Sequence, residues 1–194
     1  MELEKQENIS RTSSGWACCK SGGVKLPSLK AHLIFWSVLA GGVALDLWSK
    51  KAVFAWLENS EHGSVSVIKG FIHLVTAVND GAAFGLFAGH PGRLIAVSVA
   101  ALAAVLIAFL FGGSGHKLTY AVLGLFAAGI CGNLYDRIFN DGFVRDFIDV
   151  VVWPGKHWPA FNIADSMLCI AMALLIFSSL FTERSSGKRV PQRK

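Results

Sequence analysis

Five aspartates lie close together in the second half of the chain, in a segment flanked by long apolar runs. The segment covers residues 133–165, and its acidic residues are Asp136, Asp141, Asp146, Asp149 and Asp165. Carboxylates next to membrane-length helices are energetically expensive, so they are candidates for a functional site. Two carboxylates held together share one proton, and such a pair can activate water while polarising a peptide carbonyl. The residue types alone do not select which two of the five would form the pair.

Other catalytic chemistries have weaker support in the sequence. The chain contains no HExxH, GxSxG or phosphate-loop motif. Its four cysteines form no CxxC pair, and four histidines show no metal-ligand spacing: His62, His73, His90 and His157. Ser49 and Lys50 are adjacent, and neighbours on a helix point about 100° apart, which argues against a serine–lysine nucleophile. We therefore expect neither a metal nor a cofactor.

The composition indicates a membrane protein. Of the 194 residues, 53% are hydrophobic and 16% are charged, and the mean hydropathy is +0.50. A soluble domain usually carries about 25% charged residues. Four apolar runs approach the roughly 20 residues that cross a bilayer as a helix, and they occupy 33–56, 94–112, 118–138 and 163–181. The sequence predicts an all-α polytopic fold with four transmembrane helices.

The distribution of charge predicts the orientation of these helices. The net charge is +5, and most of the basic residues lie in the two tails: Lys5, Arg11, Lys20, Lys25, Lys30, Arg184, Lys188, Arg189, Arg193 and Lys194. An even number of spans places both tails on one side, which the positive-inside rule makes the cytoplasm. Residues 1–30 are expected to be a flexible tail, 31–182 the transmembrane domain and 183–194 a basic tail. This pattern argues against nucleic acid as a partner.

Two outer loops, at about 57–92 and 139–161, should form a small β-rich extracytoplasmic region. Partial alternation of β-branched and aromatic residues in 65–78 predicts two short strands at the membrane surface. The tripeptide Asn79-Asp80-Gly81 follows as a turn signal. Alternation in 144–153 is weaker and indicates an extended or interfacial segment. Four tryptophans fit an outer aromatic belt: Trp48, Trp56, Trp153 and Trp158.

This topology brings the polar ends of three spans to the same depth. Simpler roles exist for single residues: an interfacial ion pair for Asp46 and Lys50, turn formation for Asn79, and helix capping by Asp165. Random caps would not all fall on one leaflet, so we expect a shared site that also contains Asn133, Asp136, Arg137 and Asn162. Close helix approach is favoured by small residues, namely Gly124, Ala127, Ala128, Gly129 and Gly132.

The order of five short motifs resembles lipoprotein signal peptidase, the type II signal peptidase of bacteria. The matching stretches are DLWSK (46–50), NDGAAF (79–84), GNLYDR (132–137), VRDFIDV (144–150) and FNIADS (161–166). With the four predicted spans, the resemblance covers roughly 33–181. One departure is Leu47, where the family usually has Gln.

The resemblance implies an aspartyl endopeptidase of the bacterial inner membrane, with its active site at the outer leaflet. It would cut prolipoproteins just before the diacylglyceryl-modified cysteine, and its partners would be membrane lipid, these substrates and globomycin-type cyclic peptides. The implied catalytic pair is Asp146 and Asp165. Residues that would shape the site or hold substrate are Asp46, Lys50, Asn79, Gly81, Asn133, Asp136, Arg137, Asn162 and Ala164.

Two alternatives remain from the residues themselves. Intramembrane carboxylates also carry ions in transporters, although a polar path across the whole bilayer would then be expected. A metal-dependent hydrolase could use Asp141, Asp146 and Asp149. Under the peptidase hypothesis Asp141 belongs to a turn, Asp149 is a solvated loop residue, and Arg137 neutralises Asp136 or holds a substrate carbonyl.

Overall fold

The computed structural model describes residues 26–60, 63–81, 86–113 and 116–186. Most of the two predicted tails, including Cys18 and Cys19, lies outside the described residues. The first helix begins at Leu29, where Ser28 caps it: the Ser28 hydroxyl accepts a hydrogen bond from the backbone N–H of Ala31 at 3.3 Å.

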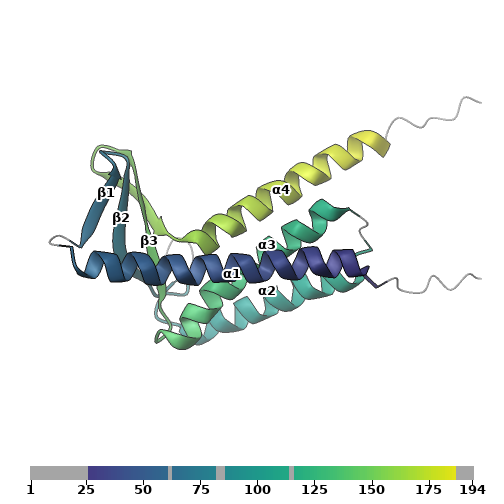
Figure 1. Ribbon diagram of the computed structural model, residues 1–194, viewed down its shortest axis with the longest axis horizontal. Helices are drawn as coiled ribbons and strands as arrows, with labels where there is room; N and C mark the ends of the chain where they lie inside the picture. Colours follow the sequence, from purple (N-terminus) through teal and green to yellow (C-terminus); the bar gives the residue numbers. More distant parts are fainter. Residues whose placement is uncertain (1–25, 61–62, 82–85, 114–115, 187–194) are drawn as a thin grey trace, which may run out of the picture.

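The described residues form four helices and four strands. In order, they are α1 (Leu29–Glu58), β1 (Ser64–Ile68), β2 (Ile72–Asn79), α2 (Pro91–Phe111), α3 (Lys117–Phe139), β3 (Val144–Trp153), β4 (Lys156–Phe161) and α4 (Ile163–Ser186). The helices form an elongated bundle with the sheet at one end, and α4 diverges from α1 away from that end (Figure 1). The start of α1 and the end of α4 both lie at the end opposite the sheet.

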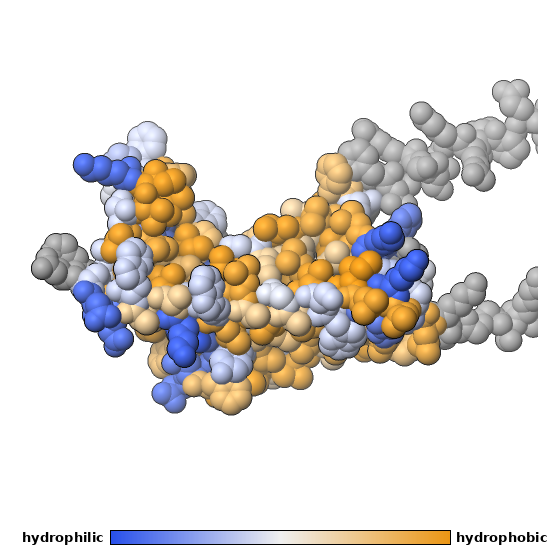
Figure 2. All heavy atoms as spheres, viewed as in Figure 1, coloured by the Kyte–Doolittle hydropathy of each residue, from blue (hydrophilic) through white to orange (hydrophobic). Residues whose placement is uncertain are grey.

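Three helices, α1, α2 and α3, are long and apolar enough to cross a membrane. In α4 the apolar part that the structure describes, Ile163–Ser178, is shorter. Hydrophobic residues dominate the visible surface along the helices, and hydrophilic residues gather toward the two ends of the molecule (Figure 2). The helical membrane fold is therefore confirmed, and the fourth span stays a prediction.

Small residues let α3 pack directly against the backbones of its neighbours. A Cβ added to Gly124 would lie 2.7 Å from the carbonyl oxygen of Phe35 in α1. One added to Gly129 would lie 2.7 Å from the carbonyl oxygen of Ala164 in α4. Both positions exclude any side chain, so the predicted close approach is confirmed. At the end far from the sheet, Phe35 and Phe109 stack at a centroid distance of 4.1 Å and join α1 to α2.

The sheet is antiparallel in the order β1-β2-β3-β4. The two strands predicted in the first loop are confirmed as β1 and β2. Weak alternation in the second loop predicts only an extended or interfacial segment. The structure shows there a ten-residue central strand, β3, which pairs with β2 and β4. Its buried positions include Val144 and Asp146 on one face and Phe147 and Asp149 on the other, so each face mixes an apolar with an acidic buried residue and the alternation is weak.

Candidate active site

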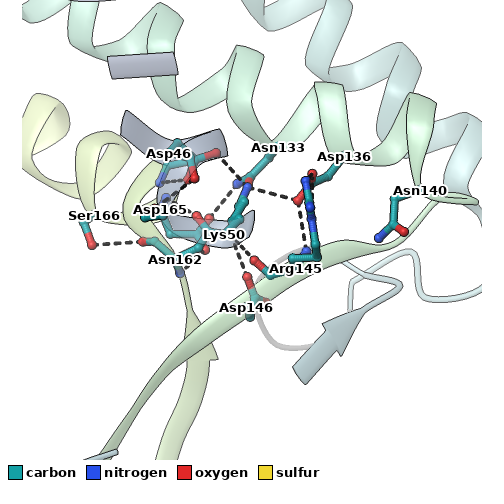
Figure 3. A network of polar contacts seen from close by, with 12 residues as sticks. Asp46, Lys50, Asn133, Asp136, Asn140, Arg145, Asp146, Asn162, Asp165 and Ser166 are labelled. Carbon is teal, nitrogen blue, oxygen red and sulfur yellow. Dashed lines mark hydrogen bonds and ion pairs between the residues drawn. The ribbon is translucent and has the colours of Figure 1, made fainter. Parts of the chain in front are cut away.

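The site lies where the sheet meets the ends of the helices, and Lys50 of α1 is near its centre (Figure 3). Its ammonium group lies 2.8 Å from Oδ2 of Asp46 and 3.1 Å from Oδ2 of Asp136. All three side chains are fully buried. The predicted pairing of Asp46 with Lys50 is confirmed, and it is more than an isolated ion pair, because Asp136 of α3 also contacts Lys50. The hydroxyl of Ser49 donates to the carbonyl of Asp46 at 2.9 Å.

Asp46 also connects α1 to the beginning of α4. Its Oδ1 accepts a hydrogen bond from the backbone N–H of Ala164 at 2.8 Å. This N–H belongs to the first turn of α4, where helices have no internal acceptor for it. A Cβ at Gly132 would collide with the Asp46 carboxylate, and Ala164 is fully buried beside that glycine. Glycine at 132 and a small residue at 164 are therefore what this junction requires.

Asp136 of α3 has partners other than its sequence neighbour. The sequence left two roles for Arg137, neutralising Asp136 or holding a substrate carbonyl, and the structure shows no direct pairing of Arg137 with Asp136 among the described residues. Asp136 instead pairs with Lys50 and with Arg145, whose Nη2 lies 2.6 Å from Oδ1. Adjacent residues on a helix point in different directions, so Arg137 faces elsewhere. Its Nη2 donates to the carbonyl of Gly81 at 2.9 Å, which ties α3 to the turn after β2.

Two asparagines connect this charged network to the aspartates. Asn133 donates from Nδ2 to Oδ1 of Asp165 at 2.7 Å. Asn162 donates from Nδ2 to Oδ1 of Asp146 at 2.6 Å and to Oδ1 of Asn133 at 3.1 Å. Lys50 donates to that same Asn133 oxygen at 3.1 Å. Asp146 and Asp165, which are far apart in sequence, therefore meet in one continuous polar network (Figure 3).

Asn162 and Asp165 form a reciprocal cap at the start of α4. The backbone N–H of Asp165 donates to Oδ1 of Asn162 at 3.0 Å, and the backbone N–H of Asn162 donates to Oδ2 of Asp165 at 3.2 Å. This is the geometry of a capping box. The capping role predicted for Asp165 is correct, and the same carboxylate is also part of the polar network.

Asp146 of β3 is almost completely buried, with 2% of its surface exposed. Its Oδ2 accepts a hydrogen bond from Nδ2 of Asn79 at 3.0 Å, and Oδ1 of Asn79 accepts from the N–H of Gly81 at 2.9 Å. Asn79 therefore builds the predicted turn and contacts the site. Burial, followed by the nearby charge of Asp165, raises the pKa of Asp146 from 3.8 to about 6, against the opposing effect of Asn79, Asn162 and Lys50.

The remaining two aspartates do not join this network in the described structure. Asp141 is exposed in the turn after α3, as predicted. Asp149 was predicted to be solvated, and this is wrong: it is 9% exposed and contacts two histidines. Nδ1 of His157 lies 2.8 Å and Nδ1 of His73 lies 3.4 Å from its Oδ2. The carboxylates of Asp141, Asp146 and Asp149 thus have different surroundings, which argues against one shared metal site.

Arg145 is the contact residue that the sequence reasoning missed. It stands directly before Asp146 in the VRDFIDV motif, and a cation beside a buried aspartate was the available signal. Its partner Asp136 lies on another element, so only the docking of β3 onto α3 reveals the pair.

Comparisons with known proteins agree with this geometry. The family model of signal peptidase (SPase) II matches residues 38–181. The lipoprotein signal peptidase of Rhodopirellula baltica is 37% identical over 193 residues, covering 90% of this chain and 85% of the relative. That of Syntrophus aciditrophicus is 41% identical over 168 residues, covering 82% of this chain and all of the relative.

A solved structure described as a bacterial membrane enzyme, obtained by the in meso method at 2.3 Å resolution, has a TM-score of 0.64 and 30% sequence identity. The match covers 84% of this chain and 94% of the solved one. The resemblance noted in the short motifs is thus confirmed over most of the chain. This protein belongs to the signal peptidase II family of bacterial membrane enzymes, the peptidases that remove signal peptides from prolipoproteins.

Proposed function

We propose that Asp146 and Asp165 are the catalytic pair of an aspartyl endopeptidase, which cuts prolipoproteins just before the diacylglyceryl-modified cysteine. The observation that carries this proposal is that both carboxylates contact Asn162. Its side-chain amide donates to Asp146 at 2.6 Å, and its backbone N–H donates to Asp165 at 3.2 Å. One residue thereby holds the two acids next to each other.

The chemistry follows from a shared proton. Because the pKa of Asp146 is raised to about 6, the pair retains one proton well above the usual range of an aspartate. The ionised partner takes a proton from the attacking water, while the protonated partner donates to the oxygen of the scissile carbonyl. The two acids titrate as a unit, so neither role belongs to one residue throughout the reaction.

The surrounding residues orient the pair and the substrate. Asn79, Asn133 and Asn162 direct amide N–H groups at the two carboxylates. The buried Asp46–Lys50–Asp136 cluster holds α1 and α3 behind them, with Gly132 and Ala164 allowing the close contact. Arg137 is 9% exposed, and its Nε has no hydrogen-bond partner among the described residues. Arg137 is the residue that we assign to hold a substrate carbonyl, near the turn at Gly81.

We place the site at the outer leaflet, with α4 as the fourth span and both termini in the cytoplasm. The support is that the start of α1 and the end of α4, which the basic stretches precede and follow in the sequence, lie opposite the sheet. A substrate whose cysteine carries acyl chains must be cut where those chains remain in the bilayer. The exposed Trp153 and Trp158 of the sheet suit the interface of such a membrane surface. Globomycin-type cyclic peptides are the inhibitors expected at this site.

The test is cleavage of a lipid-modified prolipoprotein by purified enzyme. Asp146→Asn and Asp165→Asn should each lower kcat by about 10²- to 10⁴-fold, the range of general acid–base catalysis. Asp141→Asn is the matched control, because Asp141 is exposed and has a φ of +50°, which asparagine tolerates. Near-normal cleavage by either of the first two variants would disprove the catalytic assignment, and loss of activity on adding a chelator would favour the metal-dependent alternative.

A further inference from the structure

Arg145 and Asp136 make three hydrogen bonds to each other. The backbone N–H of Arg145 donates to Oδ2 of Asp136 at 3.0 Å. The Nε and Nη2 groups of Arg145 donate to Oδ1 at 3.2 Å and 2.6 Å. Asp136 is fully buried, whereas the side chain of Arg145 is 24% exposed. The interaction thus fastens β3 to α3 through both the backbone and the side chain of one residue.

This fastening lies directly beside a catalytic aspartate. Successive side chains of a strand point to opposite faces, so Arg145 and Asp146 project in different directions from adjacent backbone positions. Arg145 is held at its N–H and side chain by Asp136, and its carbonyl accepts from Nδ2 of Asn162 at 3.4 Å. The peptide unit that leads into Asp146 is therefore fixed from both sides.

Arg145 also balances the charge of the buried cluster. Lys50 contacts two carboxylates, those of Asp46 and Asp136, and a single ammonium cannot neutralise both. Arg145 provides the second positive charge. Without it, the buried Asp136 would lack half of its compensation and would draw Lys50 toward itself. Lys50 would then be less available to Asn133, whose amide it orients toward Asp165.

A cavity of about 530 Å³ lies beside the Arg145 side chain, between the last turns of α1 and the sheet. Leu57 and Thr76 are among the other residues that line it. The Arg145 side chain is 24% exposed, so solvent reaches this side of the pair. A small cation in solution can therefore enter the space that a shortened side chain would leave.

We propose that Arg145 is a positioning residue for the catalytic pair: through Asp136 it fixes the backbone at Asp146 and keeps Lys50 available to orient Asn133. This proposal rests on the proposed function of Asp146 and Asp165. Arg145 touches neither of the reacting carboxylates, so it acts entirely through its neighbours.

The test is chemical rescue of Arg145→Ala in the prolipoprotein cleavage assay. The variant should lose about 10- to 100-fold in kcat with little change in KM, because the substrate contacts remain while the pair is misaligned. Guanidinium ion at low millimolar concentration should restore at least a third of the lost rate. Urea, which has a similar shape but no charge, should restore none. Arg145→Lys, which keeps the charge and loses part of the hydrogen bonding, should lie between the wild type and Arg145→Ala.

Lys156→Ala is the matched control, since it removes an exposed cation from the same sheet. Its kcat and KM should equal those of the wild type, and neither guanidinium nor urea should change them. Wild-type kcat and KM in Arg145→Ala would overturn the proposal. It would also be overturned if Arg145→Ala folds and is slow, guanidinium does not restore its rate, and Arg145→Lys is equally slow. If Arg145→Ala does not fold, the test falls to Arg145→Lys. A wild-type kcat in Arg145→Lys at every guanidinium concentration would then overturn the proposal. Cleavage by Asp146→Asn would instead reject the proposed function, which separates the two failures.

Discussion

The ammonium of Lys50 lies 3.1 Å from Oδ1 of Asn133, and this contact determines which way the Asn133 amide faces. The oxygen must point to the cation, so the NH₂ group points to Asp165, 2.7 Å away. The reversed amide would place an NH₂ group against an ammonium and an oxygen against a carboxylate. A buried cation on α1 thereby sets the hydrogen bonding of a carboxylate on α4.

The first prediction concerns the donor that Asn133 directs at Asp165. Asn133→Asp replaces this donor by a carboxylate oxygen and puts a third acid beside the pair. We expect kcat/KM for prolipoprotein cleavage to fall by about 10²-fold, which corresponds to about 3 kcal/mol of transition-state stabilisation. Asn140→Asp, at the end of the same helix, is the control and should retain its activity. Equal activity of the two variants would show that the Asn133 amide has no influence on Asp165.

A second prediction concerns the stability contributed by Lys50. Lys50→Met leaves the buried carboxylates of Asp46 and Asp136 without their shared cation, and breaking such a buried pair typically destabilises a protein by about 3–5 kcal/mol. The unfolding free energy in detergent should fall by that amount at neutral pH. Lys51→Met is the matched control, because the next residue is exposed and its loss should change stability by less than about 0.5 kcal/mol. A stable Lys50→Met protein would mean that the cluster rearranges.

The helices and the polar ends that converge on the site could be predicted from local patterns. Apolar length indicates the spans, and the spacing of Asn162 and Asp165 predicts a helix cap. Alternating in and out directions of the spans then place Asp46, Asn133 and Asp165 at one depth. The helix positions and the cap depend only on neighbours in the sequence, which explains why the structure confirms them, whereas the directions of the spans stay a prediction.

Pairings between elements could not be predicted in this way. Asp149 looks like a solvated loop residue because its histidine partners, His73 and His157, come from the two adjacent strands. For Asp136 the sequence offers its neighbour Arg137 as one possible partner, whereas the structure pairs it with Arg145 from a strand. Both differences arise because strand register and docking decide the partner of a side chain. The choice of Asp146 and Asp165 among five aspartates rested on the family resemblance rather than on the residues.

A third prediction concerns Asp149 as a link between strands. Its carboxylate contacts His73 of β2 and His157 of β4 from the central strand β3. Asp149→Ala should lower the unfolding free energy by about 1–2 kcal/mol, because partly buried hydrogen bonds to a charged group are lost. The loss should be absent in a His73→Ala, His157→Ala background, where Asp149 has no histidine to hold. An additive effect of the three substitutions would contradict the link.

A fourth prediction concerns the pH dependence of cleavage. In the proposed mechanism the active form of the pair carries one proton, and the raised pKa of Asp146, about 6, sets the pH above which that proton is lost. The value of kcat/KM should therefore decline about tenfold per pH unit above roughly pH 6. The measurement is a pH profile with one prolipoprotein substrate in a constant-ionic-strength buffer. A profile that stays flat between pH 6 and pH 8.5 would place the titrating proton elsewhere.

A fifth prediction follows from the same pKa through its effect on stability. The pKa of Asp146 rises from its ordinary value of 3.8 to about 6 in the folded protein, so the folded state binds this proton more strongly than the unfolded state. Its stabilising contribution is complete below about pH 4 and is lost as the pH rises through 6. A shift of this size corresponds to about 3 kcal/mol. Because an asparagine side chain cannot titrate, the unfolding free energy of Asp146→Asn relative to wild type should increase by about that amount between pH 4 and pH 8. Parallel pH curves for Asp146→Asn and wild type would contradict a raised pKa at Asp146.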